Sequence, residues 1–168
     1  SNFVRVNLGA ITVGSLILFF PALYGDSYHG LTTMLESFSS SQTIAVLPFT
    51  LALLVLLKPL AASLTLGAGG DGGVFAPSIV AGAFLGILFA YLCNQYMGTE
   101  FLVINFALIG AAATLSAAIH GPLTSIFLIS SVAPNGMQLM LPLAIGALIA
   151  YVLAKKLCTY NVYSYQGA

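Results

Sequence analysis

The chain has 168 residues, of which 60% are hydrophobic and only 5% charged, with a formal net charge of zero and a mean hydropathy of +1.05. Water-soluble domains carry about a quarter of their residues as charged groups, and disordered chains combine low hydrophobicity with high net charge. Both classes are therefore excluded. No nucleic acid partner is expected, because phosphate binding needs a basic surface. The composition predicts an integral membrane protein of one domain.

Six apolar segments follow one another, at residues 8–20, 43–66, 74–93, 101–119, 122–132 and 137–157. A membrane helix needs about 20 residues, and several of these segments are shorter or interrupted. The first is closed by Pro21, with Arg5 just outside it, and the second is interrupted by Pro48 and by Lys58-Pro59. Broken helices are tolerated in a bilayer only where protein or a water-filled cavity satisfies the backbone. This pattern favours a transporter over a simple anchor.

The polar connections between these segments are short. They cover residues 24–41, 67–73, 94–100 and 133–136. Lys155 and Lys156 end the last segment and weakly favour a cytoplasmic C-terminus by the positive-inside rule. Cys93 and Cys158 have no CxxC or histidine partner at ligand spacing, so neither a disulfide framework nor a metal site is expected.

The glycine-rich stretch at residues 67–73 is the most informative part of the chain. It contains five glycines and leads into Val74-Phe75-Ala76-Pro77. Glycine permits sharp turns. A proline fits the first turn of a helix because the N–H group that it lacks would have no intrahelical acceptor at that position. The first amides of a helix carry partial positive charge and bind anions without a basic side chain. The sequence therefore predicts an anion site at the backbone N–H groups of Val74 and Phe75.

Other interpretations of this stretch have less support. Residues 67–72 match GxGxxG, but the flanks are membrane-length apolar runs and no further acid occurs until Glu100, so a dinucleotide site is not expected. No Gly-Lys-Ser/Thr follows, which excludes a P-loop. The alternative that the glycines only allow helices to pack stays open on spacing alone. An enzyme is not expected, because Ser125, Ser130, Ser131 and His120 supply no specific pair of nucleophile and base.

The run Gly72-Gly73-Val74-Phe75-Ala76-Pro77-Ser78 resembles the GxFxP signature of the CLC family of chloride channels and proton-coupled chloride transporters. Residues 57–67 resemble the basic residue and small-polar helix that precede this loop in the family. Residues 117–125 resemble the family's helix break before its dimer-facing helices, and residues 161–164 resemble its terminal segment, where a tyrosine reaches into the anion pathway. From about Phe3 onward, nearly the whole chain resembles the second half of a CLC membrane domain.

This resemblance implies an all-α, polytopic membrane protein with short, tilted and broken helices. Residues 1–168 would form one inverted-repeat half of a CLC-type anion transport domain, a fragment whose partner is the N-terminal half of the same transporter. Chloride would be the substrate, with protons added in an exchanger, and no cofactor is implied. The family further implies a homodimer in a plasma or inner membrane. Gly73, Val74, Phe75 and Tyr163 would bind the anion, through backbone amides and the tyrosine hydroxyl.

The chain also departs from the family pattern. Asp71 stands where relatives more often have a proline or a small residue, and Ser130-Ser131 stands where many have a glutamate. His120 replaces a residue that is often basic, and we expect it to cap a helix or lie at an interface rather than relay protons. The family's serine loop and its gating and proton-transfer glutamates are absent, so channel and exchanger are not distinguished. A non-transporting scaffold that packs through small-residue helix faces remains the alternative.

Overall fold

A computed structural model of the protein describes residues 2–20, 47–69, 73–133, 136–158 and 160. Its helices are α1 (Asn2–Phe19), α3 (Leu47–Ala68), α4 (Phe75–Met97), α5 (Val103–Ile119), α6 (Pro122–Val132), the 3-10 turn η2 (Gly136–Leu139) and α7 (Met140–Leu157). The described residues contain no strand. The predicted all-α class is confirmed.

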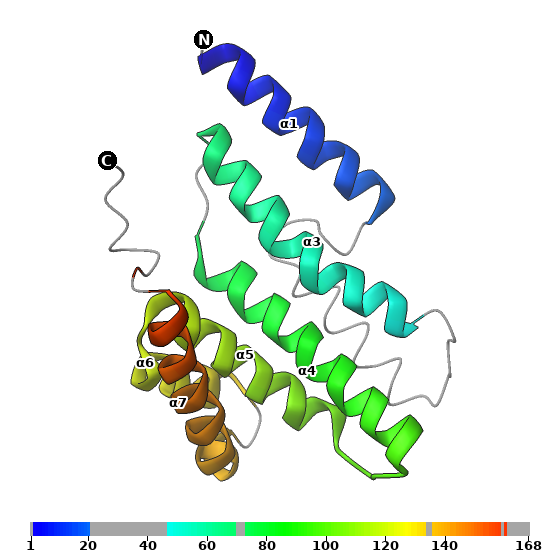
Figure 1. Ribbon diagram of the computed structural model, residues 1–168, viewed down its shortest axis with the longest axis vertical. Coiled ribbons are helices and arrows are strands. Elements are labelled where there is room, and N and C mark those ends of the chain that lie inside the picture. The colour runs from blue at the N-terminus through cyan, green and yellow to red at the C-terminus, as the bar shows by residue number, and fades with distance from the viewer. Residues whose placement is uncertain (1, 21–46, 70–72, 134–135, 159, 161–168) are drawn as a thin grey trace.

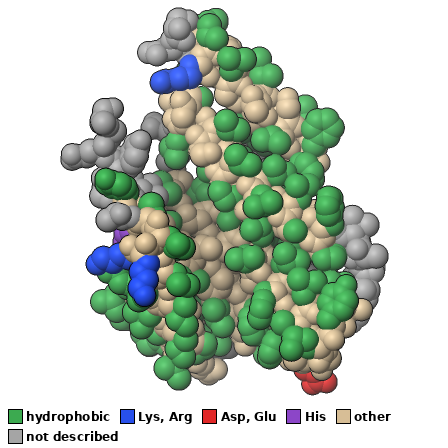
Figure 2. Space-filling view, in the orientation of Figure 1, with side chains coloured by type: hydrophobic (Ala, Val, Ile, Leu, Met, Phe, Trp, Pro, Cys, Tyr) green, Lys and Arg blue, Asp and Glu red, His purple; other side chains and the backbone are tan. Residues whose placement is uncertain are grey.

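Within the described part of the chain, three stretches of helix are long and apolar enough to cross a membrane. They are Pro48–Ala68, Phe75–Met97 and Gly136–Leu157, with 21, 23 and 22 residues. At a rise of about 1.5 Å per residue, each covers the roughly 30 Å of a hydrocarbon core. α1, α5 and α6 are apolar but shorter, and green apolar side chains cover much of the visible face (Figure 2). The combination of full-length and short helices agrees with the expected membrane fold.

α5 lies at the centre of the helix arrangement. α1, α3 and α4 lie side by side with alternating direction, and α5 packs between α4 and the pair α6 and α7 (Figure 1). The most extensive contact joins α4 to α5, followed by those of α5 with α7 and α3 with α4. The buried core accordingly draws on α3, α4, α5 and α7, and its largest members are Leu51, Leu54, Phe84, Ile87, Leu115 and Leu143.

α4 and α5 approach each other backbone to backbone. A Cβ atom added to Gly82 would overlap the carbonyl of Gly110, and one added to Gly110 would overlap the carbonyl of Gly82. A Cβ atom added to Gly86 would overlap the carbonyl of Phe106. Small residues at such a crossing allow close van der Waals contact, which drives helix association in membranes. These glycines therefore fix the position of α4 on α5.

Two hydroxyl groups of α5 tie it to its neighbours. Thr114 Oγ1 donates to the carbonyl of Ser78 in α4 at 2.8 Å, and buried Ser116 Oγ donates to the carbonyl of Ala147 in α7 at 2.8 Å. A hydrogen bond between polar groups of membrane helices contributes roughly 0.6 kcal/mol on average. The Thr114 bond helps to hold the first turn of α4 in place, and the Ser116 bond joins α5 to α7.

The observed course of α1 and α3 differs from the predicted segments. α1 begins at Asn2, so Arg5 lies inside the helix and not outside it. α3 runs through both prolines. Pro48 lies in the first turn, where a backbone N–H has no intrahelical acceptor, and Pro59 lies in the interior of the helix. A proline within a membrane helix is tolerated because neighbouring groups satisfy the backbone that it frees.

The glycine-rich connection is also shorter than predicted. α3 continues to Ala68, so Gly67 is helical and the turn begins at Gly69, which has a positive φ of 93°. α4 likewise continues to Met97, beyond the predicted end at residue 93, and Gly98 caps it with φ 64°. The prediction ended α4 at its last apolar residue, but Asn94 and Gln95 are compatible with a helix and Gly98 supplies the cap. The predicted bounds of α6 are confirmed.

Candidate functional site at the start of helix α4

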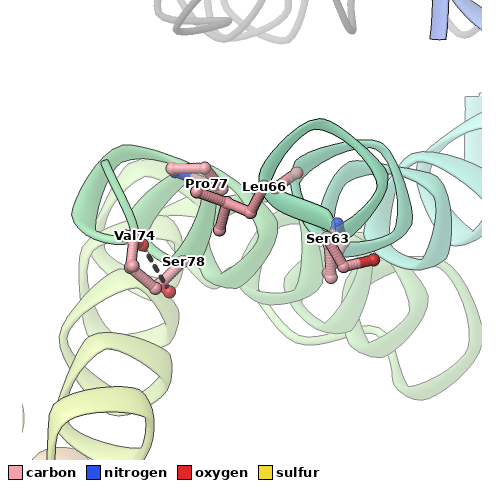
Figure 3. Close-up of a pocket in the computed structure, with 7 residues that line it drawn as sticks. Ser63, Leu66, Val74, Pro77 and Ser78 are labelled. Atoms are coloured by element: carbon pink, nitrogen blue, oxygen red, sulfur yellow. Dashed lines mark hydrogen bonds between the residues drawn. The ribbon is translucent and has the colours of Figure 1, made fainter. Parts of the chain in front are cut away.

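The first turn of α4 forms the centre of the candidate site. Val74 is the N-cap residue and Phe75 is the first helical residue, with Pro77 in the first turn as predicted. The valine side chain has no acceptor, and the N-cap makes no side-chain hydrogen bond. Ser78 is bound to the Val74 carbonyl through both its hydroxyl, at 2.8 Å, and its N–H, at 3.3 Å (Figure 3). The helix start thus keeps the partial positive charge that favours an anion.

A cavity of about 220 Å³ lies beside this helix start, between α3 and α4. One water needs roughly 10–15 Å³ of such space, so the cavity is large enough for a small ligand, and its lining is mostly apolar. In the close-up, Leu66 and Pro77 lie between the two helices, and the Ser63 hydroxyl points away from Ser78 (Figure 3). The lining residues are Val74, Pro77 and Ser78 of α4 and Pro59, Ala62, Ser63 and Leu66 of α3.

The α3 wall of the cavity is a part of the site that sequence reasoning missed. Its four residues are spaced i, i+3, i+4 and i+7, from Pro59 to Leu66, which places them on one helical face. That spacing was a usable signal. It was overlooked because the helix was predicted to be interrupted at Pro59, and a broken helix has no continuous face.

Lys58 is buried, with only 4% of its surface exposed. It lies in α3 next to Pro59, which lines the cavity, and it is the one charged residue of that helix. Ionisable residues inside membrane segments are costly and mark functional pathways by default. Lys58 is therefore a candidate functional residue of the α3 helix that borders the cavity.

The predicted anion ligands fall into two groups. Gly73, Val74 and Phe75 are consecutive at the start of α4, and Gly73 is exposed, with open space where a Cβ atom would be. Tyr163 and Asp71 lie outside the described residues. The assignment of all these residues to an anion site stays a prediction.

The remaining polar positions have structural partners. His120 is the C-cap of α5 in the left-handed conformation, with φ 54° and ψ 34°, which confirms the expected capping role. Ser130 and Ser131 donate to carbonyls one turn earlier in α6, at 3.0 and 2.8 Å. Among the described residues, no group of three or more histidine, cysteine or acidic side chains could hold a metal ion.

Comparison with known proteins identifies similar sequences. The family described as voltage gated chloride channel matches residues 1–155. The chain is 30% identical over 96% of its length to a putative ClcB-like chloride channel protein of Ralstonia nicotianae, and 32% identical over 95% to a voltage-gated ClC-type chloride channel, ClcB, of Citrobacter koseri. An uncharacterized protein of Methanocaldococcus jannaschii is 33% identical over 90% of the chain. The chain spans 35 to 36% of the length of these relatives. No solved structure matches significantly.

Proposed function

The chain belongs to the voltage-gated chloride channel family, and on that premise we propose that it forms part of a pathway through which chloride crosses the membrane. It is part of a multi-pass integral membrane protein. The observation that carries the proposal is the start of α4, where Gly73 leads directly into Val74 and Phe75 beside the cavity between α3 and α4. The backbone amides of these three residues donate to the anion, and the Tyr163 hydroxyl donates from a second side.

Backbone donors suit passage better than a direct ionic contact. A helix N-terminus offers about half a positive charge, spread over several amides. Conduction needs binding strong enough for the ion to enter and weak enough for it to leave. Partial charges meet both requirements.

Lys58 adds a longer-range contribution in this proposal. A full charge in a medium of low effective dielectric constant acts over several ångströms without touching the ion. Lys58 raises the local concentration of anions near the cavity, while the amides make the direct contact. We expect replacement of Lys58 by methionine to lower chloride flux by about three- to tenfold, and replacement by arginine to retain most of it.

The scaffold alternative is not favoured. It rests on the many small residues of the chain, but Gly82, Gly86 and Gly110 pack α4 against α5 within the chain itself. Packing within the chain therefore explains these glycines, and contact with another protein is not needed to account for them. Assembly with the remaining part of a transporter domain, as a homodimer, completes the proposal, since the chain spans about a third of the length of its relatives.

The direct test is chloride flux from liposomes that contain the whole protein carrying this chain. Insertion of one alanine between Gly72 and Gly73 displaces the amides and is expected to reduce flux to background. Val74→Ile keeps the amide and is expected to stay within about twofold of the parent, because the contact is made by the backbone. Tyr163→Ala should lower flux or change the chloride to nitrate selectivity. An insertion variant that is monodisperse and transports normally would overturn the proposal.

A further inference from the structure

The hydroxyl group of Ser78 holds the peptide with which α4 begins. Ser78 Oγ donates to the Val74 carbonyl at 2.8 Å, and the Ser78 N–H donates to the same carbonyl at 3.3 Å (Figure 3). The backbone bond is longer than the usual N···O distance of about 2.9–3.0 Å. The hydroxyl therefore makes the shorter of the two hydrogen bonds to this carbonyl. Both residues line the cavity between α3 and α4.

The Val74 carbonyl shares a peptide unit with one of the proposed anion donors. A trans peptide is planar, and its C=O and N–H groups point in opposite directions. The Val74 carbonyl and the Phe75 N–H belong to one such unit, so the direction of the carbonyl fixes the direction of the N–H. A hydrogen bond accepted by the carbonyl also polarises the peptide and makes its N–H a stronger donor. Ser78 thus orients and strengthens the Phe75 N–H.

Helix α5 holds Ser78 in turn. Thr114 Oγ1 donates to the Ser78 carbonyl at 2.8 Å, and its one hydrogen is shared with the Gly110 carbonyl at 2.9 Å. Gly82 makes room for this contact, because a Cβ atom at Gly82 would overlap Thr114 Oγ1. Two hydroxyl groups therefore connect α5 to the Val74 carbonyl by way of Ser78.

A hydroxyl that only satisfies itself is the simpler explanation, because serine and threonine in helices commonly donate to a carbonyl one turn earlier. Thr65 does so in the interior of α3, where it donates to the Ala61 carbonyl at 2.8 Å. The N–H of an interior peptide donates within its own helix, so such a bond directs no donor outward. Phe75 is the first residue of α4, and the first N–H groups of a helix have no acceptor within it. At Ser78 the same kind of bond therefore acts on an N–H that points out of the helix end.

Ser125 provides a counterpart at the start of another helix. It is the fourth residue of α6, as Ser78 is the fourth residue of α4, and its hydroxyl donates to the Pro122 carbonyl at 2.8 Å. Neither Ser125 nor Pro122 lines the cavity beside α4. Replacement of Ser125 by alanine thus removes a first-turn hydroxyl bond of the same length at a helix start for which no anion site is proposed.

We propose that Ser78 is a positioning residue for the transported anion, and that its hydroxyl, held through Thr114, aims the Phe75 N–H at the bound chloride. This inference rests on the proposed function, since it requires the Val74 and Phe75 amides to bind the ion. The one hydroxyl hydrogen of Ser78 is used on the Val74 carbonyl, so Ser78 acts through the peptide and not on the ion itself. A monatomic anion is bound best where successive N–H groups converge on one point. Loss of the hydroxyl therefore weakens chloride binding while all the amides remain.

The test measures the dissociation constant for chloride by isothermal titration calorimetry on the purified whole protein that carries this chain, together with its unfolding temperature. We expect Ser78→Ala to raise the dissociation constant about fivefold, the effect of losing about one hydrogen bond. Ser78→Thr keeps a hydroxyl and should stay within about twofold of the parent. Thr114→Val should raise the constant about twofold, because its hydrogen is only partly used on Ser78.

Ser125→Ala and Thr65→Val are the matched controls for the serine and threonine variants. Each removes a hydroxyl that bonds within its own helix, and each should leave the dissociation constant at the parent value. The comparison separates positioning from folding. A merely structural role of Ser78 would lower the unfolding temperature of Ser78→Ala without changing its affinity for chloride.

Three results would overturn the positioning role. They are an unchanged dissociation constant in Ser78→Ala, an equal rise in Ser125→Ala, and a rise in Ser78→Thr as large as that in Ser78→Ala. Insertion of one alanine between Gly72 and Gly73 distinguishes these results from failure of the proposed function. Where the insertion abolishes chloride binding and Ser78→Ala does not alter it, the proposed function stands and the role of Ser78 is wrong. Where the insertion variant binds chloride normally, both are wrong.

Discussion

The α4–α5 pair and helix α1 are both apolar, but the pair buries its large side chains and α1 exposes them. In the pair, Phe84 and Leu115 are fully buried and glycine backbones touch, whereas on α1 Leu18 and Phe19 are 84% and 80% exposed. α1 packs mainly on α3, at the edge of the molecule (Figure 1). The pair is a core that this chain builds from its own residues. The outer face of α1 is suited to lipid or to the remaining part of a larger domain.

The largest expected difference concerns glycine replacement. Gly86→Val drives a side chain into the carbonyl of Phe106, whereas Gly14 of α1 has open space around it. We expect Gly86→Val to destabilise the protein by about 3 kcal/mol and Gly14→Val by less than about 1 kcal/mol. Thermal unfolding in detergent, followed by size-exclusion chromatography, measures both. An equal loss at Gly14 would mean that α1 is tightly covered in the whole protein.

A second difference concerns two asparagines. Asn94 closes the turn between α4 and α5 by accepting from Phe101 N–H at 2.8 Å and from Thr99 Oγ1 at 2.9 Å, and by donating to the Phe101 carbonyl at 2.9 Å. Asn7 of α1 makes one exposed bond within its own helix. Asn94→Ala should cost about 2 kcal/mol and Asn7→Ala less than about 0.5 kcal/mol in the same assay. Equal effects would contradict a clamping role for Asn94.

The smallest expected difference concerns two threonines. The one hydroxyl hydrogen of Thr114 is shared between the Gly110 carbonyl of α5 and the Ser78 carbonyl of α4, whereas Thr12 of α1 bonds to Leu8 in its own helix, at 2.7 Å. Thr114→Val should cost about 1 kcal/mol and Thr12→Val close to nothing. Because Ser78 lies in the first turn of α4, Thr114→Val should also lower chloride flux. A stable variant with altered flux would link this bond to the site.

The sequence predicted much of this arrangement. The bounds of α6 followed from Pro122 at its start, and the position of Pro77 located the first turn of α4. The extension of α1 to Asn2 and the continuity of α3 through Pro59 could not be predicted, because Arg5 and Pro59 are compatible with a helix that other parts of the protein support. The close contact between Gly82 and Gly110 could not be predicted either, since no local sequence pattern indicates which helix a glycine will pack against.

The site was predicted less completely than the fold. Residues adjacent in sequence, such as Val74 and Phe75, are adjacent in any fold, so the loop motif was sufficient to place them together at the start of α4, and their role as anion ligands stays a prediction. The α3 wall depends on the packing of two helices, which the sequence does not specify. The role of Tyr163 depends on contacts outside the described residues.

The most direct test of the central claim is the position of a bound halide. Bromide, which scatters X-rays anomalously, can be located in crystals of the whole protein that carries this chain. The account predicts an anomalous peak within hydrogen-bond distance of the Val74 and Phe75 amides, and its loss when one alanine is inserted between Gly72 and Gly73. A protein that transports chloride but binds bromide only elsewhere would contradict it.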